Sequence, residues 1–139
     1  KAEKIAKLVV GYNPGWKQGI KMGKKNNQNF VHLPFRKILN ILKYKLQDNG
    51  IAYQEQEESY TSKASYLDND MIPIYKENNK VNYLFSGKRI KRGLYQSKLG
   101  KIIDADLNGA LNILKKSGEK LIEELDYLQY NPIFTSKLV

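Results

Sequence analysis

The chain has 139 residues, a net charge of +10 at neutral pH and 41% hydrophobic residues, which fits one modest globular domain over residues 1–139. The absence of cysteine excludes disulfides, zinc–thiolate sites and thiol nucleophiles, and one histidine leaves little for imidazole chemistry. Because no apolar run approaches the roughly 20 residues of a membrane span and no signal peptide is evident, we expect a cytoplasmic protein without a membrane partner.

Basic and acidic residues are segregated along the chain. Residues 4–47 contain ten basic residues and no acidic one, and residues 80–101 contain seven basic residues and again no acidic one. When lysine and arginine side chains contact phosphates, counterions are released from the nucleic acid, which favours binding. This pattern therefore predicts a nucleic-acid-binding surface around a small acidic region. A basic surface that is simply solvated is the alternative interpretation.

The first part of the chain predicts a strand, a helix and a second strand. Residues 5–11 form a short apolar run with β-branched side chains, followed by a turn signal. Residues 34–48 begin with proline and carry apolar residues at helical spacing, and Asn49-Gly50 would end this helix. Residues 51–57 follow at once, and this order with short connections predicts a parallel pair of strands.

Two further segments are basic. Residues 16–29 show no apolar period and are predicted to form a loop, in which the candidates for phosphate binding are Lys17, Lys24 and Lys25. Residues 83–95 predict a hairpin with its turn at Ser86-Gly87. Near that turn, four side chains are placed to hold phosphates: Lys88, Arg89, Lys91 and Arg92. A charged edge that discourages strand pairing is an equally good interpretation.

Carboxylates occur where the second strand ends and where a later helix begins. Only one of the neighbours Glu57 and Glu58 is expected to face a site at the carboxyl end of the strand, because side chains alternate. The later helix is predicted from Asp104, its N-cap, to the stop at 115–118, with Asp106 inside the first turn. These acids predict a divalent-metal site, although aspartates also favour a first helical turn for its dipole alone. Residues 119–129 predict a final amphipathic helix.

Several segments form an ordered set of motifs: EESYTSKAS at 57–65, SGKRIKRG at 86–93 and DADLNGALNI at 104–113, with GWKQ at 15–18 and NNQNFV at 26–31. This set resembles the C-terminal part of the TnpB (OrfB-type) insertion-sequence transposase family. The resemblance implies a RuvC-like nuclease with an RNase H-like α/β fold. We expect a partial form, with a parallel strand-helix-strand unit, a basic hairpin insertion at 64–101, a C-terminal catalytic helix and no opening strands.

The resemblance also implies a chemistry and the residues that perform it. Family members cut DNA with two divalent metals, usually Mg²⁺ (or Mn²⁺), and characterised ones are guided by RNA. The last catalytic aspartate corresponds to Asp106. The glutamate corresponds to Glu58, which we prefer, or Glu57, because Gly11-Tyr12 occupies the position at which many relatives carry theirs. No zinc is expected, since residues 64–101 lack the four cysteines of many relatives.

The predicted function is the C-terminal part of a transposon-encoded, metal-dependent DNA endonuclease, associated with the nucleoid, with DNA and guide RNA as partners. Without the first catalytic aspartate and the opening strands, the isolated chain is expected to be inactive and prone to self-association. The alternative is a DNA- or RNA-binding module without catalysis, in which Asp106 and a glutamate do not approach to the metal-bridging distance of about 4–6 Å. A basic ribosomal-type or assembly protein would explain the charge but not the acids.

Overall fold

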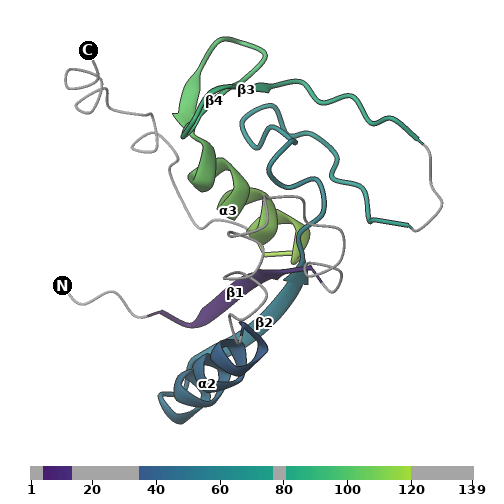
Figure 1. Cartoon of the computed structure of the whole chain (residues 1–139). Coiled ribbons are helices and arrows are strands. Elements are labelled where there is room, and N and C mark those ends of the chain that lie inside the picture. Colours follow the sequence, from purple (N-terminus) through teal and green to yellow (C-terminus); the bar gives the residue numbers. More distant parts are fainter. Residues whose placement is uncertain (1–4, 14–34, 77–80, 120–139) are drawn as a thin grey trace, which may run out of the picture. The chain divides into compact units, whose positions relative to one another are not determined.

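The computed structural model describes residues 5–13, 35–76 and 81–119. The chain divides into two compact units, Lys1–Glu57 and Glu58–Val139, and Figure 1 labels all of the helices and strands given below except β5. The sequence predicted one domain over residues 1–139. Whether the two units pack together as one domain depends on their relative arrangement, so this stays a prediction. The loop predicted at 16–29 lies outside the described residues, as does all of the predicted helix at 119–129 except Glu119.

The first unit is a parallel strand-helix-strand arrangement, as predicted. Strand β1 (Lys7–Tyr12) pairs in parallel with β2 (Ala52–Glu57), in a register that runs from Lys7 opposite Ala52 to Tyr12 opposite Glu57. Helix α2 (Phe35–Asp48) connects them along the chain and buries Leu39. Gly50 follows the helix with φ +69°, a left-handed conformation that glycine adopts without steric cost. The α/β class of the fold is therefore confirmed in this unit.

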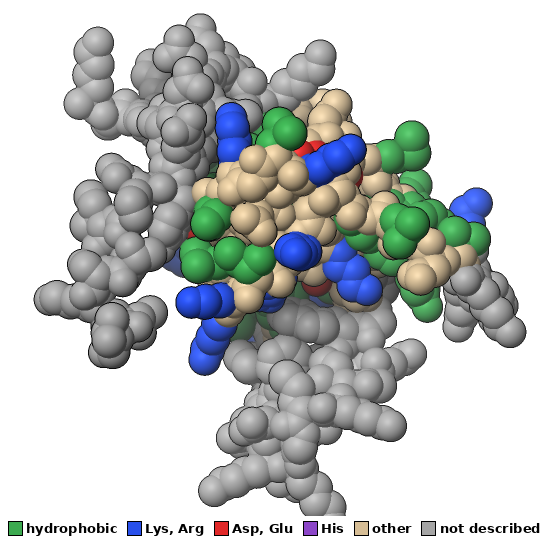
Figure 2. Space-filling model, turned by 90° about the horizontal axis from the view of Figure 1, so that it is seen from above, with side chains coloured by type: hydrophobic (Ala, Val, Ile, Leu, Met, Phe, Trp, Pro, Cys, Tyr) green, Lys and Arg blue, Asp and Glu red, His purple; other side chains and the backbone are tan. Residues whose placement is uncertain are grey.

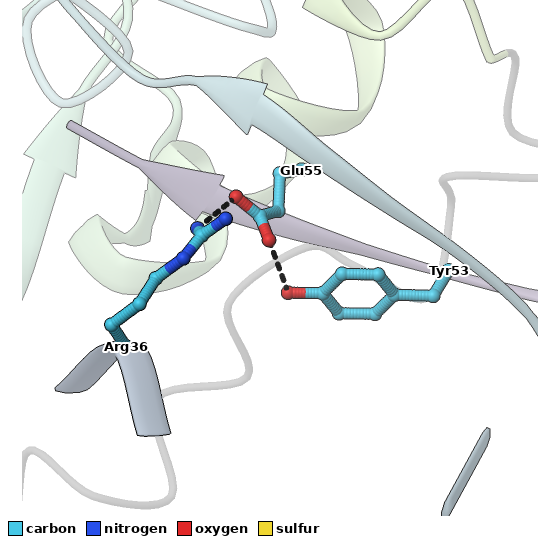
Figure 3. A network of polar contacts seen from close by, with 3 residues as sticks. All are labelled: Arg36, Tyr53 and Glu55. Atoms are coloured by element: carbon cyan, nitrogen blue, oxygen red, sulfur yellow. Dashed lines mark hydrogen bonds and ion pairs between the residues drawn. The ribbon is translucent and has the colours of Figure 1, made fainter. Parts of the chain in front are cut away.

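A polar network connects α2 to β2 (Figure 3). Arg36 Nη1 donates to Glu55 Oε2 at 2.6 Å, and the Tyr53 hydroxyl donates to Glu55 Oε1 at 3.3 Å. The hydrogen bond and the charge of Glu55 raise the pKa of Arg36, while burial, followed by Glu55, raises the pKa of Tyr53. Because the guanidinium is exposed, this ion pair orients Glu55 more than it stabilises the fold.

The second unit contains a three-stranded antiparallel sheet and a helix. The sheet has the order β3 (Lys88–Lys91), β4 (Leu94–Gln96) and β5 (Ile102–Asp104), and α3 (Ala105–Lys116) follows β5 directly. Strand β5 was not predicted, whereas α3 was. Within the described residues, neither α2 nor α3 is long and apolar enough to cross a membrane.

The position of the predicted hairpin turn was wrong. The strands of the hairpin are β3 and β4, so the turn lies at Arg92-Gly93 and not at Ser86-Gly87. Gly93 has φ +78°, the backbone conformation that this turn requires and that other residues rarely adopt. Gly87 has another role, because a Cβ atom there would lie 2.5 Å from the Tyr95 ring. Position 87 therefore requires glycine because the Tyr95 ring leaves no room for a side chain, not because the chain turns there.

The core of the second unit lies between the sheet and α3. Its buried residues are Tyr95, Ile103, Ala105 and Leu111, against which Tyr66, Leu67 and Leu107 pack. Burying each of the larger side chains stabilises the folded unit by about 1.5–3 kcal/mol relative to exposure. The irregular segment between Glu58 and Lys76 thus shares a core with the sheet and α3, although it contains no helix or strand.

Candidate nucleic-acid interface and carboxylate site

The two aspartates at the start of α3 have different surroundings. Asp104 Oδ1 accepts hydrogen bonds from the backbone N–H groups of Asp106 and Leu107, both at 2.9 Å, so Asp104 is the predicted N-cap. Asp106 is exposed in the first turn, and its carboxylate takes no part in this cap. Only Asp106 therefore presents a carboxylate that capping does not occupy.

The predicted glutamates lie at the junction of the two units. Glu57 is the last residue of β2, and Glu58 is the first residue of the second unit; both are half-buried. In the described part of the chain, no group of three or more His, Cys, Asp or Glu residues could hold a metal ion. Two carboxylates of this chain that share a metal with other ligands would not make such a group, so the roles of Asp106, Glu58 and Glu57 stay predictions.

Two asparagines of α3 hold the irregular segment in place. Asn108 Nδ2 donates to the Ala64 carbonyl at 2.9 Å, and Asn108 Oδ1 accepts from the Tyr66 backbone N–H at 3.0 Å. Asn112 Nδ2 donates to the carbonyls of Thr61 and Ala64, at 2.9 and 2.7 Å. Both side chains are fully buried. This amide clamp, Asn108 and Asn112, fixes residues 61–66, the Thr-Ser motif, against the helix.

Two aspartates of the irregular segment accept backbone hydrogen bonds from distant residues. Asp70 Oδ2 accepts from the N–H groups of Ser65 and Ser86, at 2.8 and 3.0 Å. Asp68 Oδ2 accepts from the Ser65 hydroxyl and from the Lys98 N–H. Each carboxylate therefore joins the segment around Ser65 to the polypeptide before or after the β3–β4 hairpin. The resemblance places the zinc ribbon of other family members in this part of the chain.

The buried hydroxyl of Tyr95 completes these connections. It donates to the Lys63 carbonyl at 2.7 Å. Burial, followed by the negative charges of Asp70 and Asp68, raises the pKa of Tyr95 to about 12. The hydroxyl therefore keeps its proton and its hydrogen bond throughout the neutral range, which ties the centre of β4 to the Thr-Ser motif.

Asp70→Asn is expected to lower the free energy of unfolding by about 2 kcal/mol at neutral pH, because two backbone N–H groups lose a charged acceptor. Burial alone would raise the pKa of Asp70, but hydrogen bonds from Ser86 and Ser65 and the charge of Lys115 outweigh it and lower the pKa. Such a carboxyl stabilises the fold above its ordinary pKa of about 4, and this contribution disappears as the pH falls through the lower folded-state value. Wild type should therefore lose stability below about pH 4.

Urea denaturation between about pH 7 and about pH 3 measures this effect. Asp70→Asn should show a flatter dependence on pH than wild type, because the variant lacks the carboxyl whose pKa is lowered in the folded state. Equal slopes for wild type and Asp70→Asn would contradict the role given to the Asp70 carboxylate.

The basic residues of the second unit extend over β3 and its turn. Lys88, Arg89 and Lys91 lie in β3 and Arg92 follows it, all four exposed. The other candidates, Lys17, Lys24 and Lys25, lie outside the described residues. A surface pocket of about 410 Å³ is lined by Lys63, Tyr83, Leu84, Phe85, Lys88 and Arg89 among others. Lys and Arg side chains are spread among hydrophobic ones on the face in Figure 2, where carboxylates are visible in small areas only.

The sequence interpretation did not identify the amide clamp or the two bridging aspartates. The spacing of Asn108 and Asn112, four residues apart, places both side chains on one face of a helix, and this was an available signal. Asp68-Asn69-Asp70 has the composition of a turn, which concealed the long-range contacts of its carboxylates.

Comparison with known proteins agrees with a nucleic-acid-related role. The family model described as Cas12f1-like, TNB domain matches residues 35–113, more than half of the chain. No curated protein and no solved structure matches the chain significantly. The matched range includes α2, β2, the sheet of the second unit and most of α3, up to Ile113. The mixed α/β architecture with its parallel pair of strands is compatible with a partial RNase H-like fold.

Proposed function

Because the chain belongs to the family described as Cas12f1-like, TNB domain, and thus to the TnpB/Cas12-related proteins, we propose that it is the C-terminal RuvC-like part of a transposon-encoded, RNA-guided DNA endonuclease. It represents a cysteine-free subgroup in this proposal, with DNA and guide RNA as partners. The exposed carboxylate of Asp106 carries the proposal. Its neighbour Asp104 performs the capping, so N-capping does not explain why an acid stands at 106.

Under this proposal, Asp106 and Glu58, or Glu57 in its place, are the ligands that the chain contributes to Mg²⁺ or Mn²⁺, and no zinc is involved. Hard divalent cations prefer oxygen ligands such as these carboxylates, and such a metal stabilises charge on the oxygens of the phosphodiester. The remaining ligands belong to parts of the nuclease outside the described residues. We accordingly expect the isolated chain not to cut DNA, and its self-association stays a prediction.

Metal-dependent DNA cleavage by the full-length nuclease with its guide RNA tests the proposal. We expect one of Glu57→Gln and Glu58→Gln to abolish cutting while DNA binding is retained, and the other to leave cutting intact. Glu55→Gln is the matched control on the same strand, because Glu55 is occupied by Arg36 and Tyr53. Cutting at the wild-type level in both glutamate variants would remove this assignment.

A nucleic-acid-binding module without catalysis is the second candidate. It is favoured by the basic strand β3, in which Lys88, Arg89 and Lys91 are all exposed. A full-length wild-type protein that binds its DNA target but does not cut it with either metal would support this candidate over the nuclease.

A further inference from the structure

One wall of the 410 Å³ pocket beside β3 is formed by Tyr83, Leu84 and Phe85, and the ring of Tyr60 packs against its two aromatic rings. The Tyr60 ring contacts the Tyr83 ring edge-on, with centroids 5.2 Å apart, and lies 6.2 Å from the Phe85 ring. Tyr60 has φ +66°, a conformation that a tyrosine rarely adopts and that the surrounding contacts must hold. Tyr83 and Phe85 are half-buried, whereas Leu84 between them is 92% exposed. The wall thus combines fixed rings with an apolar side chain open to solvent.

The rim of the same pocket is basic. Lys63, Lys88 and Arg89 are all exposed, and no carboxylate of the described residues forms an ion pair with them. In the β3–β4 pair, the register shifts between Arg89 and Lys91, so the rim residues are separated from Lys91 by an irregularity. The basic strand therefore has one part that lines the pocket and another that does not.

We propose that this pocket binds one nucleotide of a single-stranded nucleic acid. Tyr83, Leu84 and Phe85 contact the base, and the three basic rim residues contact the adjoining phosphates. The inference rests on the proposed function and assigns the strand-binding role to particular residues. A volume of about 410 Å³ is within the range of small-ligand sites, and bases stack on aromatic side chains with little sequence preference. The bases of a duplex are paired and stacked in its interior, so a duplex has no free base that could stack on these aromatic side chains.

A second hollow extends the proposed path of the strand. It has a volume of about 440 Å³ and shares Phe85, Gly87 and Lys88 with the first pocket, while Lys98 lines its other side. Lys88 is therefore positioned between two concave surfaces, where it can contact the phosphate that joins two successive nucleotides.

Fluorescence anisotropy with the 139-residue chain tests the pocket. The probes are labelled dT12, U12 and a 12-base-pair duplex, and the preference between the first two identifies DNA or RNA as the natural strand. The double variant Lys88→Ala/Arg89→Ala is expected to weaken dT12 or U12 binding about tenfold and to reduce the slope of log affinity against log salt by about 1.4, two contacts at about 0.7 each. The control Lys37→Ala/Lys43→Ala removes equal charge from exposed positions of α2, which were not assigned to binding, and should weaken binding less than about threefold.

A substitution in the apolar wall distinguishes binding in the pocket from nonspecific electrostatic binding to the basic surface. Leu84→Asp places a carboxylate beside the expected phosphates, and because Leu84 is almost fully exposed, the variant should fold normally. We expect about tenfold weaker strand binding. Equal losses in the two double variants, or a duplex bound as tightly as the single strands, would overturn the pocket while leaving nucleic-acid binding intact. Failure of wild type to bind any probe would overturn both the pocket and the binding function.

Discussion

If the proposed nuclease function is correct, replacing Asp106 with alanine in the full-length protein will lower DNA cleavage more than about 100-fold, since losing a residue that only supports a metal ligand already costs about 10- to 100-fold. Binding of the DNA target should stay within about twofold of wild type, because Asp106 is one exposed acid on a basic protein. The isolated chain should lose at most about 0.5 kcal/mol of stability, as expected for an exposed surface position. Single-turnover cleavage, binding and urea denaturation measure these three effects.

Asp104→Ala is the matched control, since it changes the same residue type two positions earlier. Its carboxylate accepts two backbone N–H groups, so its loss should destabilise the chain by about 1 kcal/mol. Cleavage at a temperature well below unfolding should then change much less than in Asp106→Ala. If the two variants lost cleavage in the same proportion as they lost stability, Asp106 would be a structural residue and the catalytic assignment would fail.

Local sequence patterns were sufficient for the first unit. The apolar run before Gly11 and the helical spacing up to Leu46 each produce one element, and a helix between two strands predicted the parallel pair that the structure has. Asn49-Gly50 ended the helix where predicted, because a glycine with positive φ stops a helix through its own backbone preference. Each of these elements could therefore be predicted from residues within the element or directly beside it.

In the second unit, the decisive contacts connect residues far apart in the sequence. Gly87 and Gly93 both look like turn glycines, and only the packing of Gly87 on Tyr95 distinguishes them. Strand β5 has three residues and forms by pairing with β4. Three residues are too few to show the alternation of apolar and polar side chains from which a strand is predicted. Local patterns likewise did not reveal that the carboxylates of Asp68 and Asp70 accept hydrogen bonds from residues 30 and 16 positions away. The sequence therefore indicated Asp104, Asp106 and a basic hairpin, but neither the position of the hairpin turn nor the hydrogen bonds that hold these elements in place.

The amide clamp is expected to be the largest single contribution to the stability of that framework. Asn108→Leu leaves the partly buried Tyr66 N–H without its acceptor and should lower the free energy of unfolding by about 3 kcal/mol. Asn112→Leu should cost about 2 kcal/mol, because it removes the Thr61 contact but also removes Asn112 Oδ1, a buried oxygen without a hydrogen-bond partner among the described residues. Leucine has as many side-chain heavy atoms as asparagine but larger methyl groups, so no cavity forms and overpacking contributes part of the expected loss.

The double variant distinguishes the clamp from two independent contacts. Both amides donate to the Ala64 carbonyl, so either single variant leaves this oxygen one donor, whereas Asn108→Leu/Asn112→Leu leaves it none. We therefore expect the double variant to lose about 1 kcal/mol more than the sum of the single losses. Urea midpoints give the stabilities, and hydrogen exchange at the Tyr66 amide should accelerate in Asn108→Leu more than in Asn112→Leu. Additive losses would mean that the shared carbonyl is satisfied in another way, and that the two asparagines act separately on the Thr-Ser motif.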